Sequence, residues 1–146
     1  MDRLVFVCKG NICRSAFAEI VARAEGVDSI SCGIDTVEGA PANAAAVEAA
    51  SRKGRNLGSH STTRITSLSA REGDLFVAME PWHAAYIEEH FGDGVPCTLL
   101  GLWNSPVYPH IQDPYGSTTT YFDHCFSYIE QSVCRITRAI KETKAC

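Results

Sequence analysis

The sequence contains no apolar run that approaches the roughly 20 residues a transmembrane helix requires. Its first residues also lack a charged segment followed by an apolar one, which is the pattern of a secretory signal peptide. No repeat, low-complexity tract or linker interrupts the chain. These absences argue against a secreted, membrane-bound or modular protein. We therefore expect a single cytoplasmic domain that spans residues 1–146.

Positive charge is in the minority. The 13 Lys and Arg residues are outnumbered by 17 Asp and Glu residues, which leaves a formal net charge of -4. Surfaces that bind nucleic acids or anionic membranes are usually basic, so the composition predicts neither partner. Any anion that this protein binds must be held by a local arrangement of positive groups rather than by the overall charge.

A pattern of paired cysteines is also missing. The chain has seven cysteines, an odd number at irregular spacings, which does not fit the disulfide framework of a small secreted protein. Cys8 and Cys13 have no second pair of ligands at the spacing of a zinc site, so we predict no metal. The thiols are expected to be mostly reduced, as in a cytoplasmic protein.

Strand and helix signals alternate along the chain. At 146 residues it can bury roughly 70% of its unfolded surface, which is enough for one core. We predict an α/β fold, a single three-layer domain in which helices flank a short, about four-stranded parallel sheet with ligands at the carboxyl ends of its strands. The expected strands are 4–7, 29–34, 74–79 and 98–100, the expected helices are 15–25, 41–53, 81–91 and a final one through 122–140, and a long loop covers 101–116.

The segment "VCKGNICRS" joins the first expected strand to the first expected helix. Such a turn directs backbone N–H groups and the positive end of the helix dipole to one point, where an anion can bind. Gly10 and Asn11 are residue types that tolerate the positive φ of a curled loop. In that field Cys8 is expected to be a thiolate and a nucleophile, and the planar fork of Arg14 can grip two phosphate oxygens. We therefore predict a phosphate-binding loop after the first strand.

Two simpler interpretations compete with this one. A cysteine at the end of a buried strand is usually just a small hydrophobic residue. However, Cys8 is the only cysteine followed six positions later by an arginine, and the only one at a strand-to-helix junction. A nucleotide-binding P-loop is excluded because the G-x-x-x-x-G-K-[ST] pattern is absent.

The segment "VCKGNICRSAFAE" resembles the signature of the low-molecular-weight protein tyrosine phosphatases, C-x5-R-S followed by a small or proline residue and Ala-Glu. Other segments resemble the family in the same order: "SCGI" at 31–34, "GSHSTTRI" at 58–65, "DLFVAME" at 74–80 and "DPYG" at 113–116. The resemblance extends from Leu4 to about Ile140, nearly the whole chain. Trp103 and the Ile-x-Asp-Pro-Tyr stretch are most similar to bacterial members that accompany tyrosine kinases of polysaccharide export.

The resemblance implies a protein tyrosine phosphatase that works without a cofactor. Cys8 would attack phosphorus and form a cysteinyl-phosphate, while Arg14 holds the phosphate oxygens. Asp113 would be the general acid for the leaving phenolate and then the general base for the hydrolytic water. The other phosphate-binding residues of the loop would be Lys9, Gly10, Asn11, Ile12, Cys13 and Ser15.

Two further side chains receive roles only from the resemblance. His60 would support the loop by holding an amide side chain, and Tyr115 would form a wall of the pocket and stack on the phosphotyrosine ring. Thr36 and Val37 stand where many relatives place an aromatic residue, so the opposite wall should be thin. Taken alone, His60 is an ordinary surface or core histidine and Tyr115 an exposed loop residue.

Other functions stay open at the level of sequence. Arsenate reductases share the fold and bind a tetrahedral oxyanion, but they need a relay of cysteines, and Cys97 has no cysteine near it in the chain. A non-catalytic phosphotyrosine-binding module would lack the thiol or the acid, whereas Cys8 and Asp113 are both present. Redox sensitivity is compatible with catalysis, since Cys13 can trap oxidised Cys8 as a disulfide. The expected partner is a phosphotyrosine protein, with a bacterial tyrosine kinase as one candidate.

Overall fold

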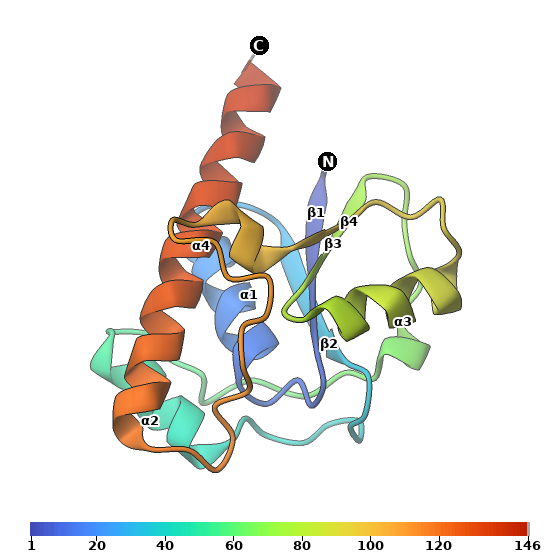
Figure 1. Cartoon of the computed structure of the whole chain (residues 1–146). Coiled ribbons are helices and arrows are strands. Elements are labelled where there is room, and N and C mark those ends of the chain that lie inside the picture. The colour runs from blue at the N-terminus through green and yellow to red at the C-terminus, as the bar shows by residue number, and fades with distance from the viewer. Residues whose placement is uncertain (146) are drawn as a thin grey trace.

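The computed structural model describes residues 1–145, and its central feature is a parallel sheet (Figure 1). Its strands are β1 (Arg3–Cys8), β2 (Ser29–Gly33), β3 (Asp74–Ala78) and β4 (Cys97–Leu99), in the order β2-β1-β3-β4. All neighbouring strands pair in parallel. β1 lies between two other strands and is buried along its whole length, which explains its continuous apolar run. The predicted four-stranded parallel sheet is confirmed.

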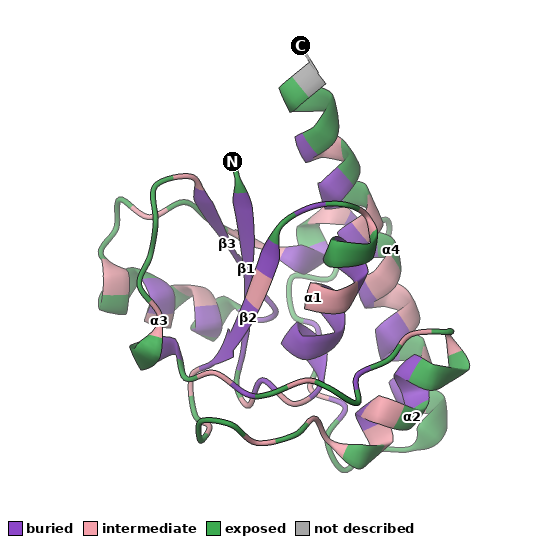
Figure 2. Cartoon of the chain, turned by 180° about the vertical axis from the view of Figure 1, so that it is seen from behind, coloured by how far each residue is buried: buried purple, intermediate pink, exposed green. Residues whose placement is uncertain are grey.

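Helices cover both faces of the sheet, as predicted for a three-layer fold. α1 (Arg14–Ala24), α2 (Ala44–Arg52) and α4 (Thr119–Ala145) lie on one side, and α3 (Pro81–Phe91) lies on the other (Figure 1). Figure 2 shows β1, β2 and β3 as the most continuously buried part of the chain, between these two helical layers, whereas the edge strand β4 is exposed or half-buried. The three longer strands are therefore shielded from water on both faces.

Alternate side chains of β1 contribute to two separate cores. Leu4 and Phe6 pack in the cluster that includes α1, α2 and α4, whereas Val5 and Val7 pack in the cluster that includes Ile87 of α3. Each fully buried side chain of this size contributes about 1.5–3 kcal/mol of transfer free energy. The alternation fixes which way each residue of the strand points, and it places Cys8 on the side of α1.

The second helix is shorter than predicted. The sequence indicated a helix over 41–53, but α2 begins at Ala44 because Asn43 caps it. The Asn43 side-chain oxygen accepts hydrogen bonds from the N–H groups of Ala45 and Ala46, at 3.0 and 3.3 Å. A capping asparagine satisfies the first N–H groups of a helix and so defines its start.

Two short 3-10 helices lie in segments for which the sequence predicted no helix. η1 (Ile65–Ser67) precedes β3, and η2 (Leu100–Trp103) follows β4 and opens the long loop. Single 3-10 turns have little hydrophobic periodicity, so sequence patterns seldom indicate them. Among residues 1–145, no helix combines the length and apolarity needed to cross a membrane.

The carboxyl ends of β1, β2 and β3 meet at one edge of the sheet. Cys8, the last residue of β1, is paired in register with Gly33 of β2. A Cβ atom on Gly33 would lie 3.0 Å from both the carbonyl oxygen of Lys9 and the carbonyl carbon of Gly10. Glycine therefore lets the segment after β1 pack directly against the end of β2. Ligands of parallel sheets bind at this edge.

Candidate active site

The segment between β1 and α1, residues 9–13, forms a tight loop at the start of an 11-residue helix. Asn11 has a φ of 57°, and it is the only non-glycine residue with a positive φ in the described part of the chain. The sequence indicated positive φ for Gly10 as well, but Gly10 does not adopt it. Asn11 alone provides the left-handed turn, because its short polar side chain can form local hydrogen bonds that offset the strain.

Cys8 lies at the base of this loop, with only 2% of its surface exposed. The backbone N–H of Asn11 donates to Cys8 Sγ at 3.3 Å, and Ser15 Oγ lies 2.9 Å from the same sulfur. The Asn11 side-chain amide donates to Ser15 Oγ at 2.9 Å, which leaves the hydroxyl hydrogen of Ser15 for the sulfur. The loop and the first turn of α1 thus place two hydrogen-bond donors at Cys8.

Asn11 also connects the loop to its surroundings. Its buried amide donates to Ser31 Oγ of β2 at 2.8 Å and accepts from the N–H of Thr63 at 2.9 Å. His60 Nε2 lies 2.7 Å from the carbonyl oxygen of Asn11. His60 therefore contacts the loop, as the resemblance implied, but it contacts a main-chain carbonyl rather than an amide side chain. These bonds hold the curled loop in one conformation.

Arg14 is almost completely buried in the first turn of α1, with 1% of its surface exposed. Its Nη1 donates to the carboxylate of Glu80 and to the carbonyl oxygen of Ile111, and its Nη2 lies 3.6 Å from Asp113 Oδ2. Burial disfavours the charged guanidinium, but the charges of Cys8, Glu80 and Asp113 outweigh it and raise the pKa of Arg14. Arg14 is therefore a permanent buried cation.

Glu80 is a site residue that the sequence analysis did not identify. It lies two residues after Ala78, the last residue of β3, and 8% of its surface is exposed. Burial opposes its ionisation, but the hydrogen bond and charge of Arg14 outweigh burial and lower the pKa of Glu80. The available signal was its place at the end of "DLFVAME", because an acidic residue directly after a buried parallel strand lies at the ligand-binding edge.

Asp113 and Tyr115 lie close together in the loop between η2 and α4. Asp113 Oδ1 accepts a hydrogen bond from the N–H of Tyr115 at 3.0 Å, while Oδ2 is the oxygen nearest Arg14. The two residues and the phosphate-binding loop enclose a cavity of about 200 Å³. Its lining consists of Cys8, Lys9, Gly10, Ile12, Cys13, Arg14, Asp35, Asp113 and Tyr115. Of the predicted site residues, only Asn11, Ser15 and His60 lie outside this lining; Asn11 belongs to the loop itself, and Ser15 and His60 contact it.

The cavity walls differ from the sequence-based expectation on one side. Tyr115 lines the cavity as predicted and is 63% exposed. Thr36 and Val37 do not line it, and the side chain that does is Asp35. Ile12, expected only as a loop residue, adds an apolar surface. The entrance therefore combines an aromatic ring, an aliphatic side chain and a carboxylate.

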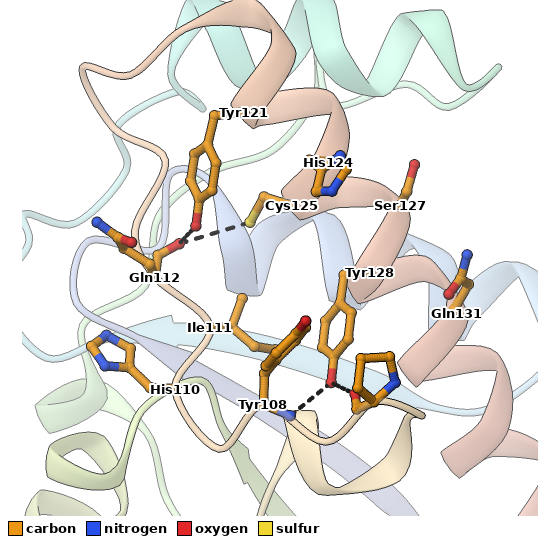
Figure 3. Close-up of a pocket in the computed structure, with 11 residues that line it drawn as sticks. Tyr108, His110, Ile111, Gln112, Tyr121, His124, Cys125, Ser127, Tyr128 and Gln131 are labelled. Carbon is orange, nitrogen blue, oxygen red and sulfur yellow. Dashed lines mark hydrogen bonds between the residues drawn. The ribbon is translucent and has the colours of Figure 1, made fainter.

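A larger cavity of about 440 Å³ lies on the other side of the same long loop, between the loop and α4 (Figure 3). Its aromatic lining residues are Tyr108, His110, Tyr121, His124 and Tyr128. Tyr121 Oη donates to the carbonyl oxygen of Gln112 at 3.3 Å, which ties the loop to α4. Neither Cys8 nor Arg14 lines this cavity, so it is separate from the one at the phosphate-binding loop.

The fold and the site define a class of proteins, the parallel α/β proteins with a C-x5-R loop between the first strand and the first helix. Residues 3–145 match the family model described as low molecular weight phosphotyrosine protein phosphatase. The chain belongs to this family, as its sequence motifs predicted.

Two curated bacterial relatives illustrate the similarity. The low molecular weight protein-tyrosine-phosphatase Etp of Escherichia coli K12 is 33% identical over 134 residues, which cover 90% of this chain and 89% of Etp. The low molecular weight protein-tyrosine-phosphatase Wzb of Salmonella typhi is 28% identical over 142 residues, which cover 95% of this chain and 94% of Wzb. The predicted bacterial type of the family is thereby confirmed.

Solved structures agree with this assignment. The tyrosine phosphatase Wzb from Escherichia coli K30, in complex with sulphate, is 30% identical with a TM-score of 0.85, and the match covers 95% of this chain and 98% of that one. The YwlE arginine phosphatase from Geobacillus stearothermophilus also has a TM-score of 0.85, over 99% of this chain and 96% of that one. At 23% identity, YwlE shows the shared fold alone.

Proposed function

We propose that this chain is a protein tyrosine phosphatase that hydrolyses phosphotyrosine through a cysteinyl-phosphate. The observation that carries the proposal is that Cys8, Arg14 and Asp113 line one small cavity although they come from three segments of the chain. A nucleophile, an oxyanion clamp and a proton donor are the three groups that this reaction needs. The relatives Etp and Wzb are both protein-tyrosine-phosphatases, which supports the substrate class.

In the first step the Cys8 sulfur attacks phosphorus, so that an S–P bond forms while the bond between phosphorus and the tyrosyl oxygen breaks. Asp113 Oδ2 gives its proton to the departing oxygen, which leaves as the neutral phenol. Arg14 and the N–H groups of residues 9–13 hold the three non-bridging oxygens. Arg14 Nη1 is engaged by Glu80 and Ile111, so its Nε and Nη2 donors serve the phosphate.

In the second step water attacks the phosphorus of the cysteinyl-phosphate. Asp113, now a carboxylate, accepts a proton from that water, and the S–P bond breaks to release phosphate and the Cys8 thiolate. Ser15 Oγ and the N–H of Asn11, at 2.9 and 3.3 Å from the sulfur, stabilise the departing thiolate. One phosphotyrosine and one water are thereby converted to one tyrosine and one phosphate.

The preference for tyrosine follows from the depth of the cavity. Cys8 is 2% exposed at its base, whereas Tyr115 at the entrance is 63% exposed. A phosphoserine side chain is too short to bring its phosphorus to the sulfur, but a phosphotyrosine ring can fill the space between Tyr115 and Ile12. A tyrosine-phosphorylated protein is therefore the proposed partner, and a bacterial tyrosine kinase of polysaccharide export is the specific candidate.

Hydrolysis of two peptides that differ only in phosphotyrosine or phosphoserine tests this function. We expect efficient release of phosphate from the phosphotyrosine peptide, no effect of EDTA, inhibition by vanadate, and almost no release from the phosphoserine peptide. A comparable kcat/KM for the two peptides would contradict the deep-pocket argument. Turnover of arsenate with thioredoxin, in the absence of phosphatase activity, would instead favour a reductase.

A further inference from the structure

The long loop that carries Asp113 is fastened to the end of β3 at residues 110 and 111. The N–H of Ile111 donates to the carbonyl oxygen of Met79 at 2.9 Å, and the carbonyl oxygen of Ile111 accepts from Arg14 at 2.6 Å. The preceding residue adds a side-chain contact, because His110 Nε2 lies 2.8 Å from Glu80 Oε1. Asp113 follows only two residues after Ile111, so these contacts set where the carboxylate lies.

The Glu80 carboxylate is the point where the loop and Arg14 meet. Its Oε2 accepts from Arg14 Nη1, and its Oε1 accepts from Trp82 Nε1 at 3.2 Å and faces His110. A carboxylate that is held through both oxygens cannot rotate without losing contacts on both sides. The His110 contact therefore restrains the carboxylate that holds Arg14.

The other nearby histidine has a different part in this arrangement. His83 is fully buried, and its Nδ1 accepts the backbone N–H of Glu80 at 3.1 Å. Burial and the charge of Arg14 lower the pKa of His83 to about 4, so it is neutral near pH 7. Its Nε2 lies 3.6 Å from Glu80 Oε2 and has no hydrogen-bond partner among the described residues. His83 fixes the main chain of Glu80, whereas His110 engages the carboxylate itself.

We propose that His110 is a positioning residue for the phosphatase reaction, which holds the loop that carries Asp113 against Glu80, the carboxylate that also binds Arg14. The inference rests on the proposed function, and it assigns His110 no contact with the substrate. His110 lines the larger cavity together with His124 and Tyr128 of α4 (Figure 3), and its Nε2 contacts Glu80 from there. The loop is thus held at two places, by Tyr121 of α4 at Gln112 and by Met79 and Glu80 after β3 at residues 110 and 111.

Removal of the His110 side chain should lower kcat most for substrates whose leaving group must be protonated. Arg14 keeps its bonds to Glu80 and Ile111 when His110 is removed, so phosphate binding should change little. Asp113 is on the loop and its side chain is 40% exposed, so its position depends on how the loop is held. Small displacements of a catalytic group are costly, on the order of 100-fold in rate for 1 Å.

The test is kcat and KM for a series of aryl phosphates in His110→Ala, His110→Gln and His124→Ala. For poor leaving groups we expect His110→Ala to lower kcat about fivefold with little change in KM. This loss in kcat is a fraction of the loss, on the order of 100-fold, that a full 1 Å displacement causes. For activated leaving groups, which need no proton, kcat should stay within about twofold. His110→Gln can place an amide N–H near Glu80 and should recover most of the loss. His124→Ala, which alters the face toward α4, should match the wild type.

Each outcome distinguishes the proposals. If His110→Ala loses rate equally across the series, or loses nothing, the positioning role is wrong while the phosphatase function stands. If the wild-type enzyme itself hydrolyses no aryl phosphate, the proposed function fails first. Thermal unfolding of each variant distinguishes the positioning effect from a general loss of stability. A loss of stability would lower the active fraction for all substrates alike.

Discussion

Two buried arginines, one at each end of the β1–β3 pair, meet acidic side chains in different ways. Arg3 donates from Nε and Nη2 to the two oxygens of Asp74, both at 2.8 Å. Arg14 gives a single nitrogen, Nη1, to Glu80 and shares it with a main-chain carbonyl. The first pair is a closed fork, whereas the second leaves most of the arginine's donors directed elsewhere.

The difference separates a structural ion pair from a binding group. Arg3 and Asp74 are paired in register at the start of their strands, and their bond fastens β1 to β3. Burial opposes ionisation of Asp74, but its hydrogen bonds with Arg3 and Arg71 outweigh burial and lower its pKa. Arg14 is hydrogen-bonded through Nη1 alone, and its Nη2, 3.6 Å from Asp113 Oδ2, belongs to the cavity that Cys8 also lines. An arginine whose donors are only partly used inside the protein is available to a ligand.

The largest expected difference is between the two arginine-to-lysine variants, Arg14→Lys and Arg3→Lys. Arg14→Lys should lower kcat/KM for aryl phosphates at least about 100-fold, because a point charge cannot replace a planar fork that stabilises the transition state. The kcat/KM of Arg3→Lys should stay within about twofold of the wild-type value, since Arg3 is five residues from Cys8 along the strand, roughly 17 Å away. Steady-state kinetics of both variants measures the contrast. A similar loss of kcat/KM in both variants would contradict the distinction between the structural Arg3–Asp74 pair and the ligand-binding Arg14.

Arg14 has a second acidic neighbour, Asp113, besides its partner Glu80, whereas Arg3 is paired with Asp74. Asp113→Asn should lower kcat about 100-fold for poor leaving groups and far less for nitrophenolate, because only the former need a proton. A plot of rate against the pKa of the leaving phenol should become steeper in the variant. An equal loss across that series would exclude Asp113 as the general acid, and Asp35→Asn is the control from the opposite wall.

The Arg14 end also contains two cysteines that line one cavity, Cys8 and Cys13. Peroxide should convert the Cys8 thiolate to a sulfenic acid, and attack by the Cys13 sulfur then expels water and forms a disulfide. Burial, together with the charge of Cys8, raises the pKa of Cys13, so this second step should be slow. We expect a reductant to restore most activity in the wild type and in Cys125→Ser, but little in Cys13→Ser. Peptide mapping that finds Cys8 sulfinic acid and no bridge in the wild type would dismiss this idea.

The smallest expected effect concerns the entrance to the cavity. Tyr115→Ala should lower kcat/KM for phosphotyrosine peptides about three- to tenfold, which corresponds to an aromatic contact of roughly 0.5–1.5 kcal/mol. Tyr115→Phe is the matched control and should keep the wild-type value, because stacking does not need the hydroxyl group. The kinetics of one peptide with the three enzymes is sufficient. A loss of the same size for inorganic phosphate as a competitive inhibitor would indicate that Tyr115 acts on the loop rather than on the ring.

Local patterns in the sequence predicted one half of the site well. A buried strand, a turn with Asn11 and a following helix are encoded in adjacent residues, so Cys8 and Arg14 could be placed before the fold was known. The partners of Arg14 could not, because Glu80 and Ile111 are 66 and 97 residues away from it in the chain. Such contacts depend on strand order and on the path of a long loop, which hydrophobic periodicity does not specify.

The cavity wall shows the same limit at short range. The resemblance placed Thr36 and Val37 at the thin wall of the cavity, yet Asp35 lines it. The N–H of Asp35 donates to the carbonyl oxygen of Lys9 at 2.8 Å, so the chain after β2 follows the phosphate-binding loop and brings Asp35 rather than its neighbours to the entrance. Which residue of an irregular segment faces a site follows from such backbone bonds rather than from residue type.

The central claim is that Cys8 accepts the phosphoryl group that the open side of Arg14 holds. The most direct test is acid quenching of the enzyme within one turnover of an aryl phosphate, followed by peptide mapping, with Cys13→Ser as a parallel sample. The account predicts a phosphoryl group on the peptide that contains Cys8 in both samples, together with a burst of released phenol. A phosphoryl group on another residue, such as His60, or a burst of phenol with no phosphorylated peptide, would contradict it.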